Sequence, residues 1–254
     1  GSKRNAGLIR DVMHALRFEP INIRLVPDFG DQFLLNAKPR AIGKTLALDL
    51  SCNPLEGKDA ALKRFFDIAI SLVVLLFILP MMAVITIAIK LTSNGPITFK
   101  QQRNGLYGDK FWVYKFRSMK VHNETDNRIT QALKGDTRIT KVGAFLRKTS
   151  LDELPQFFNV LLGDMSIVGP RPHALAHNEY YKDQVEAYMW RNKVKPGITG
   201  WAQINGFRGE TDTIDKMQKR IQYDLWYMEN WSLWWDVKIF LKTFLSGFND
   251  KNAY

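Results

Sequence analysis

The sequence has few of the residues from which disulfide frameworks and zinc sites are built. Its single cysteine, Cys52, excludes an internal disulfide and is typical of a reducing compartment. The four histidines are scattered along the chain, so no Cys/His group has the spacing of a zinc site. There is also no secretory signal peptide, internal repeat or low-complexity tract. The opening Gly-Ser predicts that the natural chain begins earlier.

Acidic residues are in the minority. The 254 residues include 36 lysines and arginines but only 25 aspartates and glutamates, which gives a formal net charge of +11. This excess predicts an anionic partner, such as nucleic acid, anionic lipid or a phosphorylated substrate. The length is enough for one large domain or two modest ones with a real core.

Residues 1–58 contain the pattern of only part of a domain. The predicted elements are one helix and three short strands, at 8–17, 21–26, 33–35 and 45–50. Because these are too few for a full sheet, we expect the end of a larger α/β domain that closes with a linker at 53–57. A second domain is then predicted over residues 59–254.

One long apolar run, Phe65–Ile89, has Asp67 as its only charge. A straight helix of that length would reach about 37 Å, which exceeds the bilayer core of about 30 Å. Pro80 lies inside the run and removes a backbone donor, which predicts a kink or break. Basic residues flank both ends, so the positive-inside rule places both on the cytoplasmic face. We predict a re-entrant helix–break–helix over about 63–90 that enters one leaflet and returns. A spanning helix and a buried core helix are the alternatives.

Two adjacent carboxylates, Asp152 and Glu153, stand between cationic residues. Arg147 precedes them, and Arg171 follows between two prolines that hold the backbone extended. Carboxylates can bind a divalent metal or attack phosphorus, and cations can neutralise phosphoryl oxygens. The pattern therefore predicts a site for phosphate chemistry.

The same residues also allow a structural interpretation. Ser150-x-x-Glu153 is a capping-box pattern, and the helix dipole favours acids in a first helical turn. The two interpretations are compatible, because a helix N-terminus also offers backbone N–H groups to a phosphate. Both stay open from the spacing alone.

Further elements follow from periodicity. A strand is predicted at 110–119, and helices at 138–148, 151–162 and within 221–248. In the strand, Lys115 and Arg117 share one face. The last segment is rich in aromatic residues interleaved with lysines, which is typical of helices at a membrane interface. Aromatic packing in a core is the alternative.

Five motifs carry a family resemblance. They are Lys63-Arg-Phe-Phe-Asp67, Tyr114-Lys-Phe-Arg-Ser-Met119, Arg147-x-x-Ser-Leu-Asp-Glu-Leu-Pro-Gln156, Asn159-Val-Leu-Leu-Gly-Asp-Met-Ser-Ile-Val-Gly-Pro-Arg-Pro172 and Pro196-Gly-Ile-Thr-Gly-Trp-Ala-Gln203. In this order they resemble the monotopic phosphoglycosyl transferases, bacterial sugar transferases that load a hexose-1-phosphate onto a polyprenyl phosphate. The family includes the undecaprenyl-phosphate glucose and galactose phosphotransferases. The similarity covers about residues 60–254.

The resemblance implies an α+β, mainly helical, monotopic protein of the bacterial inner membrane, with its active site on the cytoplasmic face. We also expect interfacial amphipathic helices and a preceding Rossmann-like domain. Residues 1–58 would be the end of that domain. Some small members place a serine before the helix-breaking proline, where this chain has Leu79-Pro80. The backbone groups freed at the break would then lack a neighbouring hydroxyl.

The implied reaction moves hexose-1-phosphate from a UDP-sugar to undecaprenyl phosphate and releases UMP, as the first membrane step of exopolysaccharide, capsule or O-antigen synthesis. UDP-glucose is favoured over UDP-galactose on overall likeness only. Asp152 would be the nucleophile that forms a phosphosugar-aspartyl intermediate, and Glu153 would bind Mg²⁺ with it or act as an acid/base partner. Arg171 would bind substrate phosphate. Further phosphate-binding and supporting candidates are Arg147, Arg117 and Asp164.

Three other functions remain as alternatives. A non-catalytic, basic membrane-surface scaffold would not depend on Asp152. A nucleic-acid-binding protein would lose affinity steeply with salt, and the apolar run argues against it. A metal-dependent phosphatase would use the same acids but pass the phosphoryl group to water. The hexose, a homo-oligomeric state and the role of the N-terminal region are not determined by the sequence.

Overall fold

The structure is a computed structural model that describes residues 38–43, 45–49, 53, 55–120, 136–185, 187–209 and 213–246. All of them belong to the second of the two units into which the chain divides, Leu34–Tyr254. In chain order the elements are β1 (Lys38–Ile42), β2 (Thr45–Asp49), α2 (Gly57–Thr92), β3 (Thr98–Asn104), η1 (Leu106–Gly108), β4 (Lys110–Phe116), α3 (Lys141–Thr149), η2 (Leu151–Glu153), α4 (Gln156–Leu162), β5 (Ser166–Val168), α5 (Leu175–Tyr181), η3 (Tyr188–Lys193), β6 (Gly197–Thr199), α6 (Trp201–Ile204), α7 (Ile214–Glu229) and α8 (Leu233–Ser246).

Helices dominate the described residues, and the strands among them form three two-stranded sheets. The predicted α+β class with mainly helical content is confirmed. The strand expected at 45–50 is β2, which pairs antiparallel with β1. The helix expected at 8–17 and the strands expected at 21–26 and 33–35 lie outside the described residues. The Rossmann-like origin of this region and the domain boundary near residue 58 stay predictions.

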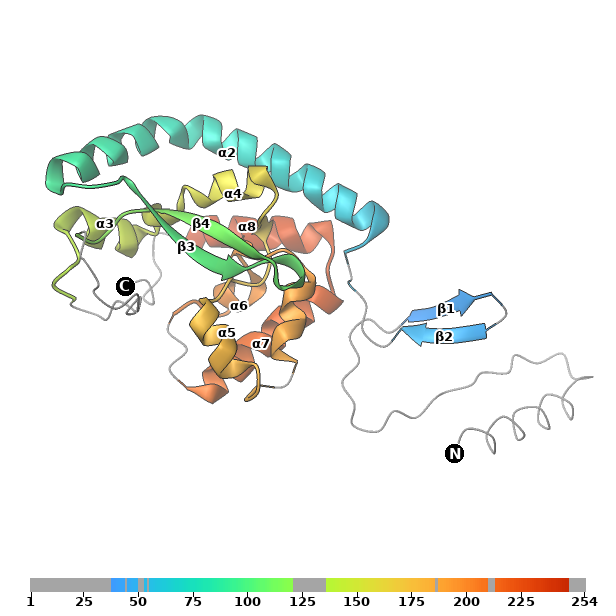
Figure 1. Cartoon of the computed structure of the whole chain (residues 1–254). Coiled ribbons are helices and arrows are strands. Elements are labelled where there is room, and N and C mark those ends of the chain that lie inside the picture. The colour runs from blue at the N-terminus through green and yellow to red at the C-terminus, as the bar shows by residue number, and fades with distance from the viewer. Residues whose placement is uncertain are drawn as a thin grey trace, which may run out of the picture. The chain divides into compact units, whose positions relative to one another are not determined.

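Helix α2 corrects one prediction. It runs through Pro80 without interruption for 36 residues, a length of about 54 Å, where the sequence predicted two helices separated by a break. Its ribbon arches instead of ending (Figure 1). A proline removes one hydrogen bond and bends a helix, but packing on both sides of it can hold the helix together.

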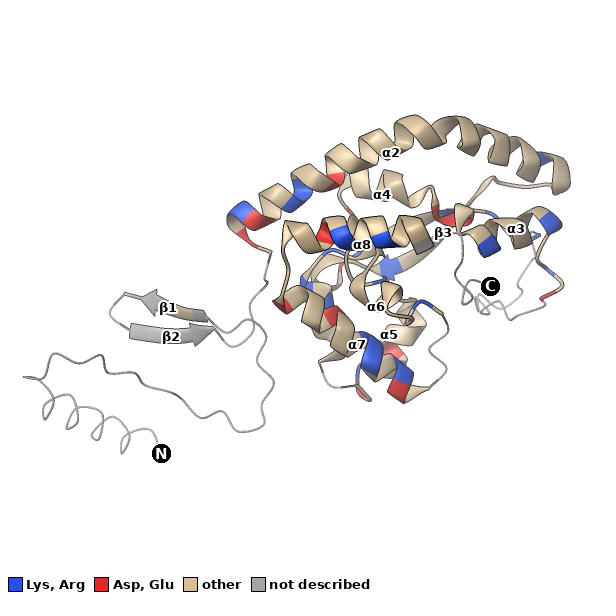
Figure 2. Cartoon of the chain, turned by 180° about the vertical axis from the view of Figure 1, so that it is seen from behind, with Lys and Arg blue, Asp and Glu red and all other residues tan. Residues whose placement is uncertain are grey.

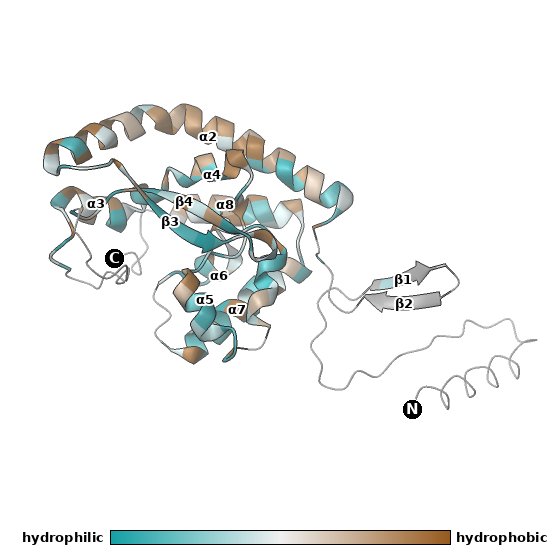
Figure 3. Cartoon of the chain, viewed as in Figure 1, coloured by the Kyte–Doolittle hydropathy of each residue, from teal (hydrophilic) through white to brown (hydrophobic). Residues whose placement is uncertain are grey.

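That packing is continuous along one face of α2. The buried side chains recur at intervals of three, four or seven residues on both sides of Pro80: Lys63, Asp67, Ser71, Leu75, Met82, Ile85 and Ile89. The opposite face is apolar and exposed, and it includes Leu72, Leu76, Phe77, Val84 and Ile87. Figure 3 shows the apolar character of α2 along most of its length, and Figure 2 shows its charged residues near the two ends. By length and composition, α2 is able to cross a membrane.

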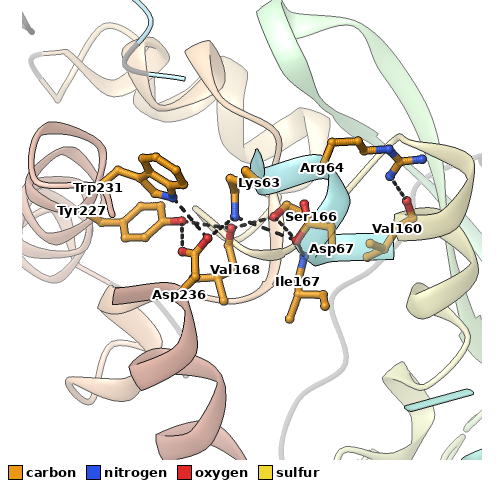
Figure 4. Close-up of polar contacts among 10 residues, drawn as sticks. All are labelled: Lys63, Arg64, Asp67, Val160, Ser166, Ile167, Val168, Tyr227, Trp231 and Asp236. Carbon is orange, nitrogen blue, oxygen red and sulfur yellow. Dashed lines mark hydrogen bonds and ion pairs between the residues drawn. The ribbon is translucent and has the colours of Figure 1, made fainter. Parts of the chain in front are cut away.

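The N-terminal part of α2 is held by a buried polar cluster (Figure 4). Lys63 Nζ donates to Asp236 Oδ2 of α8 at 2.7 Å, and both side chains are almost fully buried. Asp236 also accepts from the Tyr227 hydroxyl at 2.6 Å and from Trp231 Nε1 at 3.1 Å. One turn along α2, Asp67 accepts from the Ser166 hydroxyl and the Ile167 N–H of β5, each at 3.0 Å. The contacts of Lys63 and Asp67 therefore join α2 to α8 and to β5.

The C-terminal end of α2 is held by Arg117, which follows β4. Its guanidinium donates to the carbonyl oxygens of Ser93 and Asn94 at 2.7 and 2.8 Å and to the Ser93 hydroxyl at 2.9 Å. Both carbonyl groups belong to the two residues that directly follow α2. Both ends of α2 are therefore tied to the same body.

The aromatic residues of the C-terminal helices divide into two groups. Trp201, Trp226 and Trp235 pack together with ring centroids 4.9–5.3 Å apart, as the core-packing alternative predicted. On α8, Trp234 and Phe244 are exposed by 72% and 66%, beside Leu241 and Leu245. The exposed group gives α8 the apolar outer face that the interfacial interpretation predicted.

Candidate active site

The two carboxylates lie in a tight turn between helices. Helix α3 is followed by Ser150, whose backbone is left-handed at φ 57°. The 3₁₀ turn η2 then places Asp152 and Glu153 just before α4. The Ser150 side chain makes no helix cap; its hydroxyl accepts from Arg208 at 2.7 Å. The Glu153 carboxylate turns away from the Ser150 backbone toward two cations. The capping-box interpretation is therefore wrong.

Glu153 is buried between Lys115 of β4 and Arg171. Lys115 Nζ donates to its Oε1 at 2.7 Å, and Arg171 donates to Oε1 at 2.6 Å and to Oε2 at 3.2 Å. Burial alone would raise the pKa of Glu153, but the charges and hydrogen bonds of Arg171 and Lys115 hold it well below its usual value. Glu153 is therefore a fixed anion, and the forked contact orients the Arg171 guanidinium.

Asp152 has a different environment. Its carboxylate has no hydrogen-bond or ion-pair partner among the described residues. Burial, and then the neighbouring charge of Glu153, raise its pKa to about 6, against the opposing effect of Lys115, Arg147 and Arg171. An unpaired, partly desolvated carboxylate keeps its lone pairs free for a reaction. One carboxylate is thus held by cations while its neighbour is free.

The segment that carries Arg171 is fixed by its backbone. Gly169 N–H donates to Thr199 O at 2.9 Å, and Gly197 N–H donates to Pro170 O at 2.9 Å. The approach is so close that a Cβ atom on Gly197 would lie 2.1 Å from Gly169 N, which only glycine permits. The Arg191 guanidinium also donates to the Arg171 backbone carbonyl oxygen. The predicted stiffness of the Gly169–Pro172 segment therefore has a tertiary origin as well as a local one.

Arg191 belongs to a buried network behind the site. Its guanidinium contacts the His173 ring and lies 3.3 Å from Asp224 Oδ2 on α7. Burial, and then the charges of Arg191 and Arg220, hold the pKa of His173 well below its usual value. Sequence reasoning missed this network, because its members are far apart in the chain and match no spacing pattern.

The remaining predicted residues have separate places. Arg147 donates from Nε to the Ser118 hydroxyl at 3.0 Å and is close enough to lower the pKa of Asp152. Arg117 binds the end of α2, as described above. Asp164 accepts from Asn159 Nδ2 at 3.3 Å, and Asn159 also bonds to the β4 backbone at Trp112 and Tyr114. Asn159 thus links Asp164 to the strand that carries Lys115.

Lys115 is a site residue that the sequence analysis placed on a strand face without assigning it a role. Its signal was present: it is the lysine of Tyr114-Lys-Phe-Arg-Ser-Met119. Only the tertiary structure, which brings β4 next to η2, shows that Lys115 binds Glu153.

A divalent cation has two carboxylates to bind here. The described residues contain no group of three or more His, Cys, Asp or Glu side chains suited to a metal. Mg²⁺, however, often takes one or two carboxylates and completes its shell with water and substrate phosphate. Asp152 fits that role with free oxygens, whereas the Glu153 oxygens are shared with Lys115 and Arg171.

Comparisons with known proteins agree with this chemistry. A family model described as bacterial sugar transferase matches residues 58–250. A UDP-glucose:undecaprenyl-phosphate glucose-1-phosphate transferase of Escherichia coli (strain K12) is 50% identical over 97% of this chain and 53% of its own length. One of the same name from Klebsiella pneumoniae is 49% identical over 99% and 54%. An undecaprenyl-phosphate galactose phosphotransferase of Salmonella typhimurium (strain LT2) is 39% identical over 87% and 48%. The chain spans about half the length of these relatives.

Proposed function

Because the chain belongs to the bacterial sugar transferase family, we propose that it transfers hexose-1-phosphate from a UDP-sugar to undecaprenyl phosphate and releases UMP. UDP-glucose is the preferred donor in this proposal, since the relatives near 50% identity are named for glucose. UDP-galactose is second, after the more distant galactose phosphotransferase. The product would begin an exopolysaccharide, capsule or O-antigen on the cytoplasmic face of the inner membrane.

The observation that carries the proposal is the unequal environment of the two carboxylates. In the first step, an Asp152 oxygen forms a bond to the β-phosphorus of the UDP-sugar while the bond to the UMP oxygen breaks. UMP leaves with the electron pair, and a phosphosugar-aspartyl intermediate remains. In the second step, an oxygen of undecaprenyl phosphate bonds to the same phosphorus, and the Asp152 carboxylate leaves. Splitting one phosphoryl transfer in this way suits a carboxylate nucleophile.

The cations around Glu153 explain how phosphoryl charge is neutralised. Arg171 is oriented by its forked contact with Glu153, and Lys115 reaches the same carboxylate from β4. Preorganised donors of this kind stabilise charge on equatorial phosphoryl oxygens without moving during the reaction. Glu153 thus serves mainly to hold these donors. Mg²⁺, which Asp152 and Glu153 would hold, supplies further positive charge to the phosphoryl oxygens when bound.

The placement of α2 supports a monotopic arrangement. Its buried face contacts α3, α4 and β5, and its two ends are tied to one body through Lys63 and Arg117. Only the outward apolar face remains for lipid. We therefore propose that the chain enters and leaves the bilayer from one side, with α2 embedded along its length. The exposed apolar residues of α8 would contact the membrane interface.

The test is UMP release by the purified protein with Mg²⁺, with and without undecaprenyl phosphate, from UDP-glucose and UDP-galactose. Asp152→Asn keeps the shape and removes the nucleophile, so turnover should fall at least about a thousandfold. Asp109→Asn, an exposed aspartate outside the site, is the matched control and should match the wild type. With lipid withheld, sugar label should remain on the wild-type protein and be absent from Asp152→Asn.

Each alternative function has its own outcome. Normal turnover by Asp152→Asn would refute the assignment of the nucleophile. Release of hexose phosphate into water without lipid would identify a phosphatase. The absence of UMP release from either sugar, with lipid present, would refute the proposed donor and favour the membrane-surface scaffold.

A further inference from the structure

Arg103 of β3 is a cation at the candidate site that no motif singled out. Strand β3 pairs antiparallel with β4, with Phe99 opposite Lys115 and Arg103 opposite Phe111. Directly opposed residues share a face of the hairpin, and so do residues two apart along a strand. Arg103 and Lys115 therefore lie on the same face, about 14 Å apart along it at roughly 3.4 Å per residue.

The neighbours of Arg103 place it beside Arg171. Its backbone forms an isolated antiparallel bridge with Ala174, three residues after Arg171. Burial, and then the charge of Arg171, lower the pKa of Arg103 to about 10, against the opposing effect of Glu153 and Tyr188. The bridge to Ala174 and the effect of Arg171 on its pKa thus place Arg103 next to Arg171.

The guanidinium of Arg103 has unused binding capacity. Its one hydrogen-bond partner in the described part of the chain is Gln101 Oε1, at 2.5 Å, on the same strand face. An arginine carries five N–H donors. Lys115, Arg171 and Arg103 carry three positive charges against the two carboxylates Asp152 and Glu153, which leaves an excess of positive charge. A half-buried cation with free donors beside a second arginine is suited to a phosphate group.

We propose that Arg103 binds the phosphate monoester that leaves in the first half-reaction and the one that enters in the second. The inference rests on the proposed function and on in-line displacement at phosphorus. Asp152 attacks from one side, so the UMP phosphate departs on the opposite side. When undecaprenyl phosphate later displaces Asp152, it too must approach from the side opposite the aspartate. Both monoesters therefore occupy one position in turn, next to the phosphoryl group that Arg171 holds.

The experiment compares Arg103→Gln and Arg103→Lys with the wild type. Lys100→Gln is the matched control: it removes one positive charge from the same strand, but Lys100 is exposed, lies on the other face and contacts the Tyr114 ring. The measurements are the inhibition constant of UMP and the KM for undecaprenyl phosphate. Arg103→Gln should raise both about tenfold, which corresponds to about 1.4 kcal/mol. Arg103→Lys should lie between, and Lys100→Gln should change neither by more than twofold.

The outcomes separate the inference from the proposed function. If both constants stay within twofold of the wild type in Arg103→Gln, Arg103 binds no phosphate monoester. If only one rises, the shared position is refuted. If the wild type releases no UMP from any UDP-sugar, the proposed function fails instead. Calorimetric titration of UMP into the wild type and into Arg103→Gln then still decides whether Arg103 binds the nucleotide phosphate, because it compares the two dissociation constants directly. Arg103→Lys keeps the charge and serves this titration if Arg103→Gln does not fold.

Discussion

Replacing Asp236 by asparagine should destabilise the domain strongly, because this residue joins α8 to α2 (Figure 4). Its Oδ2 atom accepts from Lys63 at 2.7 Å and from Trp231 at 3.1 Å, and its Oδ1 atom accepts from Tyr227 at 2.6 Å. The Lys63 and Asp236 side chains are exposed by only 7% and 0%. Without Asp236, the nearest carboxylate to the buried Lys63 ammonium among the described residues is Asp67, at 3.9 Å.

The size of the effect follows from this burial. Removing one partner of a buried ion pair costs about 3–5 kcal/mol, since the other charge is left uncompensated. Domains are stable by about 5–15 kcal/mol, so this is a large share of the total. For a chain of this size, a melting temperature lower by roughly 6–20 °C is expected. Lys63→Met combined with Asp236→Asn should recover part of the loss, because the Lys63 charge is then gone while the asparagine oxygen still accepts a hydrogen bond.

The assay is unfolding in detergent micelles, followed by tryptophan fluorescence, for the wild type, each single variant and the double variant. Asp183→Asn, an exposed aspartate, is the control and should stay within about 0.5 kcal/mol of the wild type. A free energy of unfolding for Asp236→Asn within about 1 kcal/mol of the wild type would refute the reasoning. So would a double variant that is as unstable as the sum of the single changes.

Two further predictions concern pH and membrane topology. His173 stays neutral in the fold because its pKa is held well below the usual value, whereas the unfolded chain takes up a proton below about pH 6.5. The contribution of His173 to the free energy of unfolding should therefore be lost as pH falls below about 6.5, by up to about 1.4 kcal/mol per pH unit. The measurement is the difference in free energy of unfolding between wild type and His173→Gln. A difference that is the same at pH 7.5 and at pH 5.5 would contradict this. For the topology, Lys58→Cys and Asn94→Cys, each in a Cys52→Ser background, should both react with a membrane-impermeant maleimide in inverted vesicles and not in intact cells. Labelling of the two positions from opposite sides would show a spanning helix.

The sequence predicted the family of this protein correctly because its motifs are local. Asp152 and Glu153 are neighbours, and the prolines around Arg171 restrict the backbone wherever they occur. The apolar run from Phe65 to Ile89 likewise indicates a long membrane-associated helix from composition alone. Helical and strand periodicity located β4, α3, α4 and α8, because periodicity reports which side of each element is buried.

Only the tertiary structure decided which partner each polar group has. Glu153 fits a capping box in sequence, yet Lys115 and Arg171 take its carboxylate, because charge-assisted contacts at a buried site are stronger than a local cap. The same contacts leave Asp152 free. Arg103 joins the site through strand register and a backbone bridge to Ala174, which no spacing in the chain reveals.

Helix α2 shows the same division. Its composition makes it apolar, and Pro80 predicts a break from local sterics. Packing of one face from Lys63 to Ile89 instead keeps the helix continuous, and Arg117 is drawn to its far end. Local sequence determines the conformation that each segment prefers. Contacts between residues far apart in the chain determine whether that preference prevails, because burial and hydrogen bonding in the folded core can exceed it in free energy.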